Sequence, residues 1–210
     1  MTDPSPEPAD LAALAAALRA LPPSLGPVRL VAVDGYAGSG KTTFAGRLAA
    51  ALGGAPVLHL DDLATHRKPF GWVERLRAQV LEPLACGERA RYEVYDWVAG
   101  AFGASAELPP APVVLLEGVG AGRRAVRPVL AALLWMELDR AAARARGEER
   151  DGPELADFWA DWARAEEAHF AADPSRPHAG ARVDGITGRI VGSTLSEPFQ
   201  VVLTCDVARI

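Results

Sequence analysis

The sequence predicts an α/β domain built on a doubly wound, five-stranded parallel sheet with flanking helices and a small arginine-rich lid. Two features of the sequence lead to this fold class. Short apolar runs rich in Val and Leu alternate with longer segments of helical periodicity, which is typical of consecutive β-α units. A glycine-rich segment follows the first of these runs, and acidic residues follow two others. Because ligands of open parallel sheets bind at the carboxyl ends of the strands, these segments predict where the site lies.

The composition is that of a globular chain. Of the 210 residues, 50% are hydrophobic, which is enough for a substantial core in one large domain. The net charge of −5 argues against nucleic acid or an anionic membrane as a partner. The acidic, proline-rich start is unlike a signal peptide, and no apolar run reaches the ~18 residues of a transmembrane helix. The two cysteines form no disulfide or metal pattern, so we expect a cytoplasmic protein.

The chain divides into three predicted parts. An N-terminal lead with a short helix occupies residues 1–25, the main domain residues 26–185, and a tail of unassigned role residues 186–210. The short helix is expected over 11–21, because its leucines fall on one face and two prolines end it. The tail contains a candidate strand over 199–204 and no chemical motif.

The first strand of the main domain, within residues 28–33, leads into a glycine-rich loop and then a helix expected over 41–52. The loop reads Gly35-Tyr36-Ala37-Gly38-Ser39-Gly40-Lys41-Thr42 and fits the phosphate-binding pattern G-x-x-x-x-G-K-[ST], known as Walker A. Glycines let consecutive backbone amides curl around phosphate oxygens, and the helix N-terminus adds partial positive charge. We expect Lys41 to reach the β- and γ-phosphates of a nucleotide and the Thr42 hydroxyl to ligate Mg²⁺. The predicted nucleotide contacts are Gly35, Ala37, Gly38, Ser39, Gly40, Lys41, Thr42 and Thr43.

Acidic residues follow two further strands. Asp61 and Asp62 come directly after the strand expected over 56–60. Either could accept the proton of a substrate hydroxyl that attacks a γ-phosphate; a helix cap or a carboxylate in the Mg²⁺ shell is the alternative. Glu117 ends the buried strand 112–116 and is expected near Mg²⁺ or its waters.

The remaining elements follow from the same periodicities. We expect a loop over 63–71, helices over 72–84, 125–132, 139–152 and 153–172, and strands over 92–97, 133–138 and 181–185. Glycines after Glu117 predict a tight loop. Within the strand over 92–97, Tyr95-Asp96-Trp97 could stack on a ring-bearing substrate and hydrogen-bond to it, or could equally be half-buried sheet residues.

The segment from about 139 to 152 contains four arginines: Arg140, Arg144, Arg146 and Arg150. In a chain of net negative charge, such a cluster suits a lid that closes over a triphosphate, and Gly147 could let the lid flex. The alternative is a solvated helix whose glutamates pair with the arginines. The aromatic residues of the next helix, among them Phe158, Trp159 and Trp162, are assigned to core packing.

With these segments in order, the chain resembles the uridine kinase-like branch of the P-loop small-molecule kinases, within the P-loop NTPase superfamily. The resemblance spans roughly residues 28 to 185 and rests on VDGYAGSGKTT, HLDD, VYDW, LLEG and the arginine-rich segment that ends in Arg150-Asp151. The chain departs from the family's pattern at Gly100, where a His is usual, and in the loop over 63–71, which lacks the usual aromatic residue.

The resemblance implies roles for particular residues. Asp61 would be the base for a sugar 5′-hydroxyl, with Asp62 as the alternative, and Tyr95 would contact a nucleobase. Arg146 and Arg150 of the lid would bind phosphates. The predicted function is transfer of the γ-phosphoryl group of ATP, with Mg²⁺, to a hydroxyl of a small molecule, a nucleoside first. The predicted catalytic residues are Asp61, Lys41, Arg146 and Arg150, the metal ligands Thr42 and Glu117, and the substrate contacts Asp62, Tyr95, Asp96 and Trp97.

Two other functions remain open from the sequence. Another small-molecule kinase, acting on a nucleoside monophosphate, pantothenate or a sugar acid, would share the phosphate-binding residues. For a monophosphate, Arg67, Arg89 or Arg91 could supply the extra positive charge. A regulatory NTP-binding switch would have no metabolite acceptor. The sequence does not decide whether the chain forms a homo-oligomer.

Overall fold

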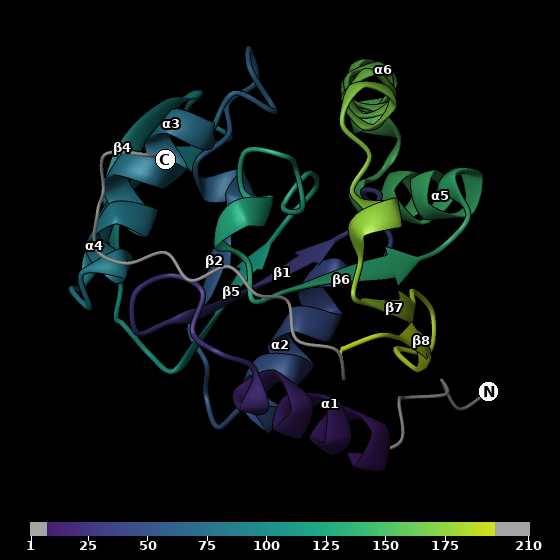
Figure 1. Cartoon of the computed structure of the whole chain (residues 1–210). Coiled ribbons are helices and arrows are strands. Elements are labelled where there is room, and N and C mark those ends of the chain that lie inside the picture. Colours follow the sequence, from purple (N-terminus) through teal and green to yellow (C-terminus); the bar gives the residue numbers. More distant parts are fainter. Residues whose placement is uncertain (1–7, 196–210) are drawn as a thin grey trace.

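A six-stranded sheet, in the order β2-β5-β1-β6-β7-β8, forms the centre of the molecule (Figure 1). The computed structural model describes residues 8–195. The strands are β1 (Arg29–Asp34), β2 (Val57–His59), β5 (Val113–Glu117), β6 (Ala132–Glu137), β7 (Ala181–Asp184) and β8 (Ile190–Ser193). The first five are parallel, which confirms the predicted fold class, and β8 pairs antiparallel with β7. β8 is not among the predicted elements, because a four-residue strand that contains Gly192 carries little alternating pattern.

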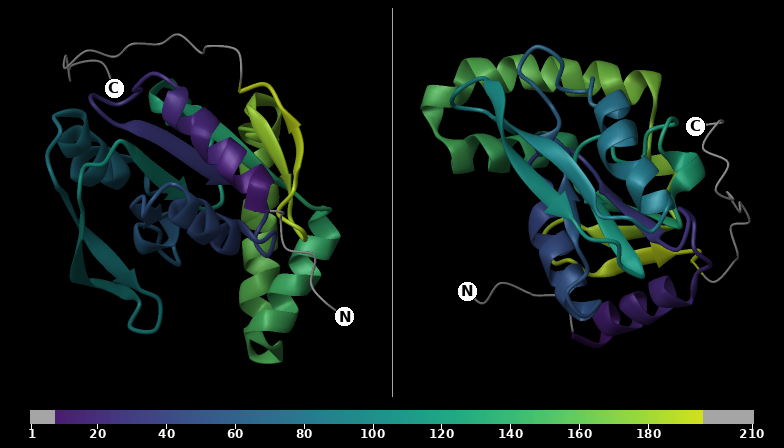
Figure 2. Two further views of the ribbon diagram at one scale, coloured as in Figure 1. Left: turned by 90° about the horizontal axis from the view of Figure 1, so that it is seen from below. Right: turned by 90° about the vertical axis from the view of Figure 1, so that its left-hand side faces the viewer.

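Successive side chains of β1 enter two separate cores, because they point to opposite faces of the sheet. Val31 and Val33 pack with helices α1 (Pro8–Ala20) and α2 (Lys41–Ala51), whose positions agree with the predicted helices. The alternate residues of the strand face the helical segment from 73 to 85 on the other side. Helices therefore cover both faces of the sheet (Figure 2).

The helix predicted over 72–84 is present, but its winding changes midway. Its parts are α3 (Val73–Leu76), a π-helical turn (Arg77–Leu81) and α4 (Glu82–Ala85). Pro83 has no N–H to donate to the carbonyl four residues before it, and the Glu82 amide bonds the Arg77 carbonyl, five residues back. The proline thus accounts for a local widening of the helix.

The strand predicted over 92–97 lies outside the central sheet. It is β3 (Ala90–Asp96), which forms an antiparallel hairpin with β4 (Ala101–Leu108). β4 is not among the predicted elements, because small residues such as Gly103 and Ala104 have a weak preference for strands. β3 packs against the 3₁₀ turn Leu60–Asp62, which carries two of the predicted site acids.

The helix predicted over 125–132 is wrong. Only a 3₁₀ turn, Arg127–Val129, forms there, because Pro128 has no N–H to donate and Leu130 already has extended backbone. The predicted tight loop after β5 is confirmed, since Gly118 and Gly120 adopt φ angles of 150° and 83°.

Two helices continue from β6 at the carboxyl edge of the sheet (Figure 1). They are α5 (Arg140–Asp151) and α6 (Ala156–Ala172), joined by the 3₁₀ turn Pro153–Leu155, and they match the predicted helices. Gly147 does not interrupt α5. It is buried, and a β-carbon at its position would lie 2.1 Å from the Trp159 ring. This glycine therefore serves the close approach of α5 to α6.

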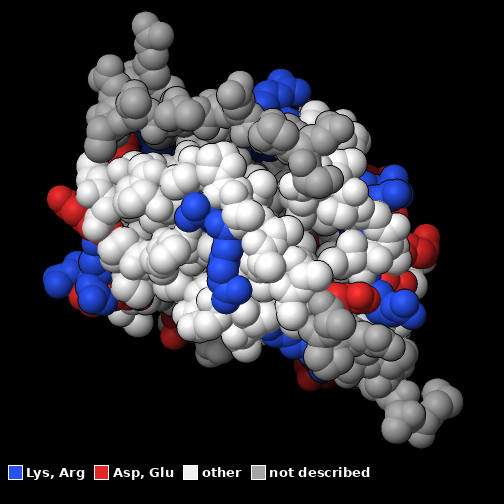
Figure 3. Space-filling model, turned by 60° about the horizontal axis from the view of Figure 1, so that its bottom comes forward, with Lys and Arg blue, Asp and Glu red and all other residues white. Residues whose placement is uncertain are grey.

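Two expectations fall outside the described residues, namely the start of the N-terminal lead and the candidate strand over 199–204. Within residues 8–195, no helix is long and apolar enough to cross a membrane. The face that carries α1 has few charged side chains (Figure 3), since alanines dominate the exposed side of that helix. No residue of α1 lines the two cavities described below.

Candidate active site

The glycine-rich loop joins β1 to α2 and has the backbone that its sequence predicts. Gly35, Gly38 and Gly40 have φ angles of 151°, 82° and 89°, which side-chain-bearing residues rarely adopt. A β-carbon on Gly38 would lie 2.0 Å from the Ala143 carbonyl oxygen of α5. The loop is therefore held in direct contact with the arginine-rich helix.

Asp34, the last residue of β1, fixes the start of this loop. Its carboxylate is fully buried and accepts hydrogen bonds from the amides of Gly35, Gly120 and Gly122 at 2.7, 2.8 and 2.9 Å. Burial raises the pKa of Asp34, and the hydrogen bonds partly oppose this. The sequence analysis missed this residue, although an acid at the end of a buried strand is the same signal that identified Asp61 and Glu117.

A cavity of about 350 Å³ adjoins the loop and is lined by most of the residues predicted to bind phosphate and metal. Its lining comprises Ala37, Gly38, Gly40, Lys41, Thr42, Thr43, Asp61, Glu117, Gly118, Val119, Arg146, Arg150 and Trp162. Lys41 donates a hydrogen bond to the Tyr36 carbonyl at 2.9 Å, and Arg146 donates to the Gly185 carbonyl at 3.1 Å. Arg150 pairs with both carboxylate oxygens of Asp151, at 2.6 and 2.8 Å.

The side chains and backbone amides that line this cavity fit a nucleoside triphosphate. Three cationic side chains converge on a loop rich in backbone amides, and the buried Ser39 hydroxyl has no hydrogen-bond partner among the described residues. Thr42 and Glu117 face the same cavity and fit Mg²⁺. In the described chain, no cluster of three or more His, Cys, Asp or Glu side chains could hold a metal by itself.

The two acids after β2 differ in surroundings. The Asp61 carboxylate is accessible from the cavity, and the enclosing protein raises its pKa, while Lys41 opposes the rise. Asp62 does not line either cavity and accepts a long hydrogen bond of 3.4 Å from the Tyr92 hydroxyl. The structure therefore brings Asp61, rather than Asp62, together with Lys41.

Glu117 is buried and already has a partner. Its carboxylate lies 2.7 Å from Nδ1 of His59, and this contact raises the pKa of His59. The sequence analysis missed His59, whose only signal is its position two residues before Asp61. The imidazole fixes one carboxylate oxygen and so orients Glu117 in the cavity.

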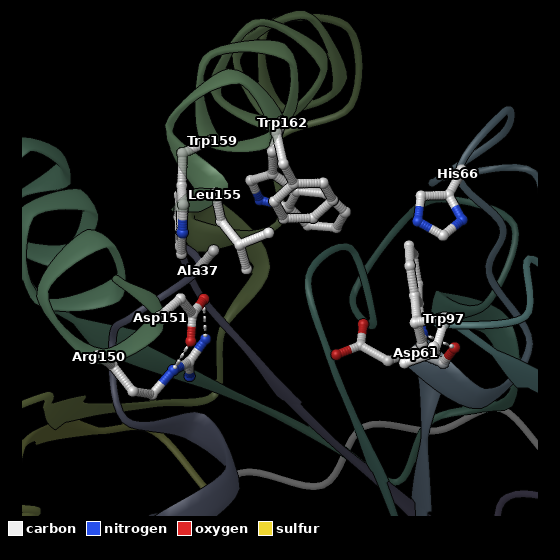
Figure 4. A pocket seen from close by; sticks show the side chains of 11 residues that line it. Ala37, Asp61, His66, Trp97, Arg150, Asp151, Leu155, Trp159 and Trp162 are labelled. Carbon is white, nitrogen blue, oxygen red and sulfur yellow. Dashed lines mark hydrogen bonds and ion pairs between the residues drawn. The ribbon is translucent and has the colours of Figure 1, made fainter. Parts of the chain in front are cut away.

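A second cavity of about 400 Å³ adjoins the first and has mainly aromatic walls (Figure 4). Its lining comprises Ala37, Asp61, His66, Trp97, Val98, Arg150, Asp151, Leu155, Phe158, Trp159 and Trp162. Side chains of α6 form one wall together with Leu155 of the preceding turn and the end of α5. His66 and Trp97 form the other wall, with the Asp61 carboxylate between the two in Figure 4. Four residues, Ala37, Asp61, Arg150 and Trp162, line both cavities.

Two aromatic side chains of α6, Phe158 and Trp162, correct the sequence assignment to core packing, whereas the assignment holds for the buried Trp159. The rings of Phe158 and Trp162 have centroids 6.0 Å apart and planes inclined by 27°, and both side chains line the second cavity. Trp159 is buried and also lines it. Across the cavity, the Trp97 indole donates a hydrogen bond to the Asp61 carbonyl at 3.1 Å. Trp97 is therefore fixed to the backbone of Asp61.

The three residues of the predicted Tyr95-Asp96-Trp97 segment lie in different environments. Only Trp97 lines the cavity. Tyr95 is buried behind it, with its hydroxyl 2.9 Å from Nδ1 of His66. Asp96 accepts the amides of Val98 and Ala99 and caps the hairpin turn, so the structure does not bring it to the site.

His66 is a cavity residue that the sequence analysis missed. It comes from the loop over 63–71, packs against Trp97 with centroids 4.7 Å apart, and lines the second cavity. A β-carbon on Gly100 would lie 3.8 Å from the Tyr95 hydroxyl, the group that His66 contacts. The imidazole of His66 thus contacts Tyr95 from the loop over 63–71.

Comparison with known proteins gives matches among solved structures. No family model and no curated protein matches the chain. A provisionally assigned fructose transport system kinase from Silicibacter sp. TM1040 shares 27% identity over 75% of this chain and 94% of that one, with a TM-score of 0.59. A provisionally assigned uridine kinase from Bacillus stearothermophilus (19% identity, 84% and 98% coverage, TM-score 0.62) also matches. D-glycerate 3-kinase from Cryptococcus neoformans var. grubii matches as well, with 14% identity over 91% of this chain and 97% of that one and a TM-score of 0.56.

The chain has the fold of these three kinases, which are P-loop kinases of the uridine kinase-like branch. The likeness supports the prediction of a P-loop small-molecule kinase, and it does not select a nucleoside, because the three neighbours are named for different acceptors. The three arginines considered for a monophosphate acceptor line neither cavity; they are Arg67, Arg89 and Arg91. Arg89 and Arg91 instead pair with Glu107 on the hairpin.

Proposed function

We propose that the chain is an ATP-dependent kinase that phosphorylates a hydroxyl of an uncharged, ring-bearing small molecule, with a nucleoside as the first candidate. The observation that carries the proposal is the position of Asp61 in the lining shared by the two cavities. A carboxylate at this junction can contact a hydroxyl in the aromatic cavity while facing the phosphate end of the other.

The loop cavity would hold the donor. Bound MgATP would supply a γ-phosphoryl group whose charge the metal partly neutralises. Lys41 and the loop amides other than that of Ala37, which donates to Glu166, would bind the β- and γ-phosphates. Thr42 and Glu117 would serve Mg²⁺. Arg146 and Arg150 would stabilise the charge that develops during transfer, which requires them to turn from their present partners toward phosphate oxygens.

The aromatic cavity would hold the acceptor. A planar ring could stack against Trp97 on one side or Phe158 and Trp162 on the other. Asp61 would accept the hydroxyl proton as the oxygen attacks, a contribution of about 10²–10⁴ in rate. Asp62, outside the cavity, would act on the substrate only indirectly, and Tyr95 would act through His66.

The charges of the aromatic cavity favour an uncharged acceptor. Arg150 is the only cationic side chain in its described lining, and Asp151 already neutralises it. A phosphate or carboxylate on the acceptor would face Asp61 without a compensating arginine. This argues against a nucleoside monophosphate, pantothenate or a sugar acid.

A second candidate acceptor is a neutral sugar. The neighbour of highest identity among the three is named for fructose transport, and the apolar faces of sugar rings also pack on indole rings.

A screen with radiolabelled ATP tests the proposal. Purified protein with Mg²⁺ is incubated with nucleosides, neutral sugars, nucleoside monophosphates and sugar acids, and labelled products are separated. We expect label on a nucleoside or a neutral sugar and none on the two anionic classes. Hydrolysis of ATP that no metabolite alters would contradict the proposal and favour a regulatory NTP-binding switch.

A further inference from the structure

Glu166 is a buried acid to which the proposed phosphoryl transfer gives no role. It lies on α6, and its side chain is 5% exposed. One carboxylate oxygen accepts a hydrogen bond of 2.7 Å from the Ala37 amide of the glycine-rich loop. Ala37 lines both cavities, so this bond joins a distant helix to the backbone at their junction.

A second contact between the same helix and the same loop lies one turn further along. The Phe170 ring packs edge-on against Tyr36, with centroids 5.3 Å apart. Tyr36 in turn packs edge-on against Trp135 of β6 at 5.5 Å. Since Tyr36 and Ala37 are adjacent, α6 is held to the loop at two neighbouring points. A shift of α6 by one residue, about 1.5 Å along its axis, would break the 2.7 Å hydrogen bond.

Glu166 lies on the same side of α6 as the aromatic wall. Trp162 and Trp159 precede it by four and seven residues, which places them on one helical face. Both tryptophans line the aromatic cavity. A displacement of the loop that pulls on Glu166 would therefore move the wall as part of one rigid helix.

The charges around Glu166 favour retention of the contact. Burial raises the pKa of Glu166, while the hydrogen bond from Ala37 and the charges of Lys41 and Arg140 partly oppose this rise. Arg140 also binds the Ala163 carbonyl of α6 at 3.2 Å, which ties the lid helix to the same unit.

We propose that Glu166 is a positioning residue that couples the nucleotide-binding loop to the aromatic wall of the acceptor cavity. Through the Ala37 amide, a nucleotide on the loop fixes the axial position of α6 and orders the wall before the acceptor arrives. The proposal rests on the proposed function, in that the loop is taken to bind ATP. Its consequence is that donor and acceptor sites communicate through the Glu166–Ala37 hydrogen bond, with the Phe170–Tyr36 contact beside it.

Hydrogen–deuterium exchange on the full chain tests this coupling without knowledge of the acceptor. The probe is Mg²⁺ with the non-hydrolysable ATP analogue AMP-PNP, and calorimetry records its binding separately. In the wild type, we expect the analogue to slow exchange in peptides from α6 by about 5-fold or more, the lower end of usual allosteric coupling. Glu166→Met keeps the length of the side chain without a carboxylate, and we expect it to bind the analogue but lose this protection.

Two further variants separate coupling from packing. Glu166→Gln keeps an oxygen that can accept from Ala37, so it should retain the protection. Asp161→Asn removes an exposed acid that pairs with Arg164 on the same helix, so it should behave as the wild type. Phe170→Leu removes the ring on Tyr36 and should weaken the protection even if Glu166→Met folds poorly.

The outcomes distinguish this proposal from the proposed function. Binding of the analogue to the wild type without protection of α6 overturns the coupling alone. Full protection in Glu166→Met, or in Phe170→Leu where Glu166→Met does not fold, also overturns it. Absence of any binding to the wild type overturns the proposed function and the coupling with it.

Discussion

At the scale of single residues, the junction between the two cavities assigns different tasks to two neighbouring acids. Asp61 faces both cavities, whereas Asp62 faces neither and contacts Tyr92. Asp61→Asn keeps the shape of the side chain but cannot take a proton. We expect kcat to fall by about 10² or more while the affinity for MgATP is kept, as measured by steady-state kinetics and calorimetry. Asp62→Asn is the matched control, and a larger loss of kcat in that variant would make Asp62 the base.

A buried histidine predicts how stability depends on pH. His169 of α6 stacks on Phe70 with centroids 4.4 Å apart, and burial, aided by Arg123, lowers its pKa from 6.5 to about 4. In the unfolded chain His169 becomes protonated as the pH falls below 6.5, whereas in the folded protein it stays neutral until the pH reaches about 4. Stability should therefore fall across this window by up to about 3 kcal/mol.

Denaturant unfolding between pH 7 and pH 4 measures this effect by comparison with a variant. His169→Gln cannot be protonated in this range, so the loss of stability with falling pH should be smaller than in the wild type. Carboxylates titrate in both proteins, and the comparison removes their contribution. Equal pH dependence in the two proteins would show that His169 is not the source.

At the scale of elements, the contact of α5 with α6 makes a prediction that opposes helix propensity. Alanine is a better helix former than glycine by about 1 kcal/mol, so Gly147→Ala would stabilise an isolated α5. Here the added methyl would lie 2.1 Å from the buried Trp159 ring. Overpacking of this kind costs about 1–3 kcal/mol and should displace the aromatic wall. We expect lower stability in urea and a higher KM for the acceptor.

Gly46→Ala is the control for this substitution. Gly46 lies in the middle of α2, and a β-carbon there would meet nothing within 4 Å. This variant should gain about 0.5–1 kcal/mol of stability. A similar gain in Gly147→Ala would contradict the close packing of the two helices.

At the scale of the whole molecule, the elements that the sequence predicts correctly are those with a strong local pattern of residues. The parallel core follows from apolar runs, and the loop conformation follows from Gly35, Gly38 and Gly40. Elements with weak patterns are missed, as in β4 and β8, and Pro128 breaks a predicted helix.

The donor half of the candidate site was predictable, as were Asp61 and Trp97 in the lining of the acceptor cavity. Lys41, Thr42 and Glu117 follow a motif and strand ends, which a sequence displays directly. His66 and Glu166 enter the site through contacts between segments far apart in the chain. No periodicity records such contacts. The aromatic residues of α6 fit a core pattern as well as a cavity wall, so their role depends on where the helix lies.

Nucleotide binding should stabilise the whole fold, and the two lysines of the chain allow a matched test of where it binds. A ligand at 100 times its Kd adds about 2.7 kcal/mol to stability.

Lys41 lines the loop cavity, and its loss should reduce the binding free energy by about 1.5–3 kcal/mol, typical of a hydrogen bond to a charged group. Thermal unfolding with and without Mg²⁺ and AMP-PNP should therefore show a large shift in Tm for the wild type and a much smaller one for Lys41→Ala. Lys68 is exposed and lines neither cavity, so Lys68→Ala should keep the full shift. Equal shifts in both variants would place the nucleotide away from the glycine-rich loop.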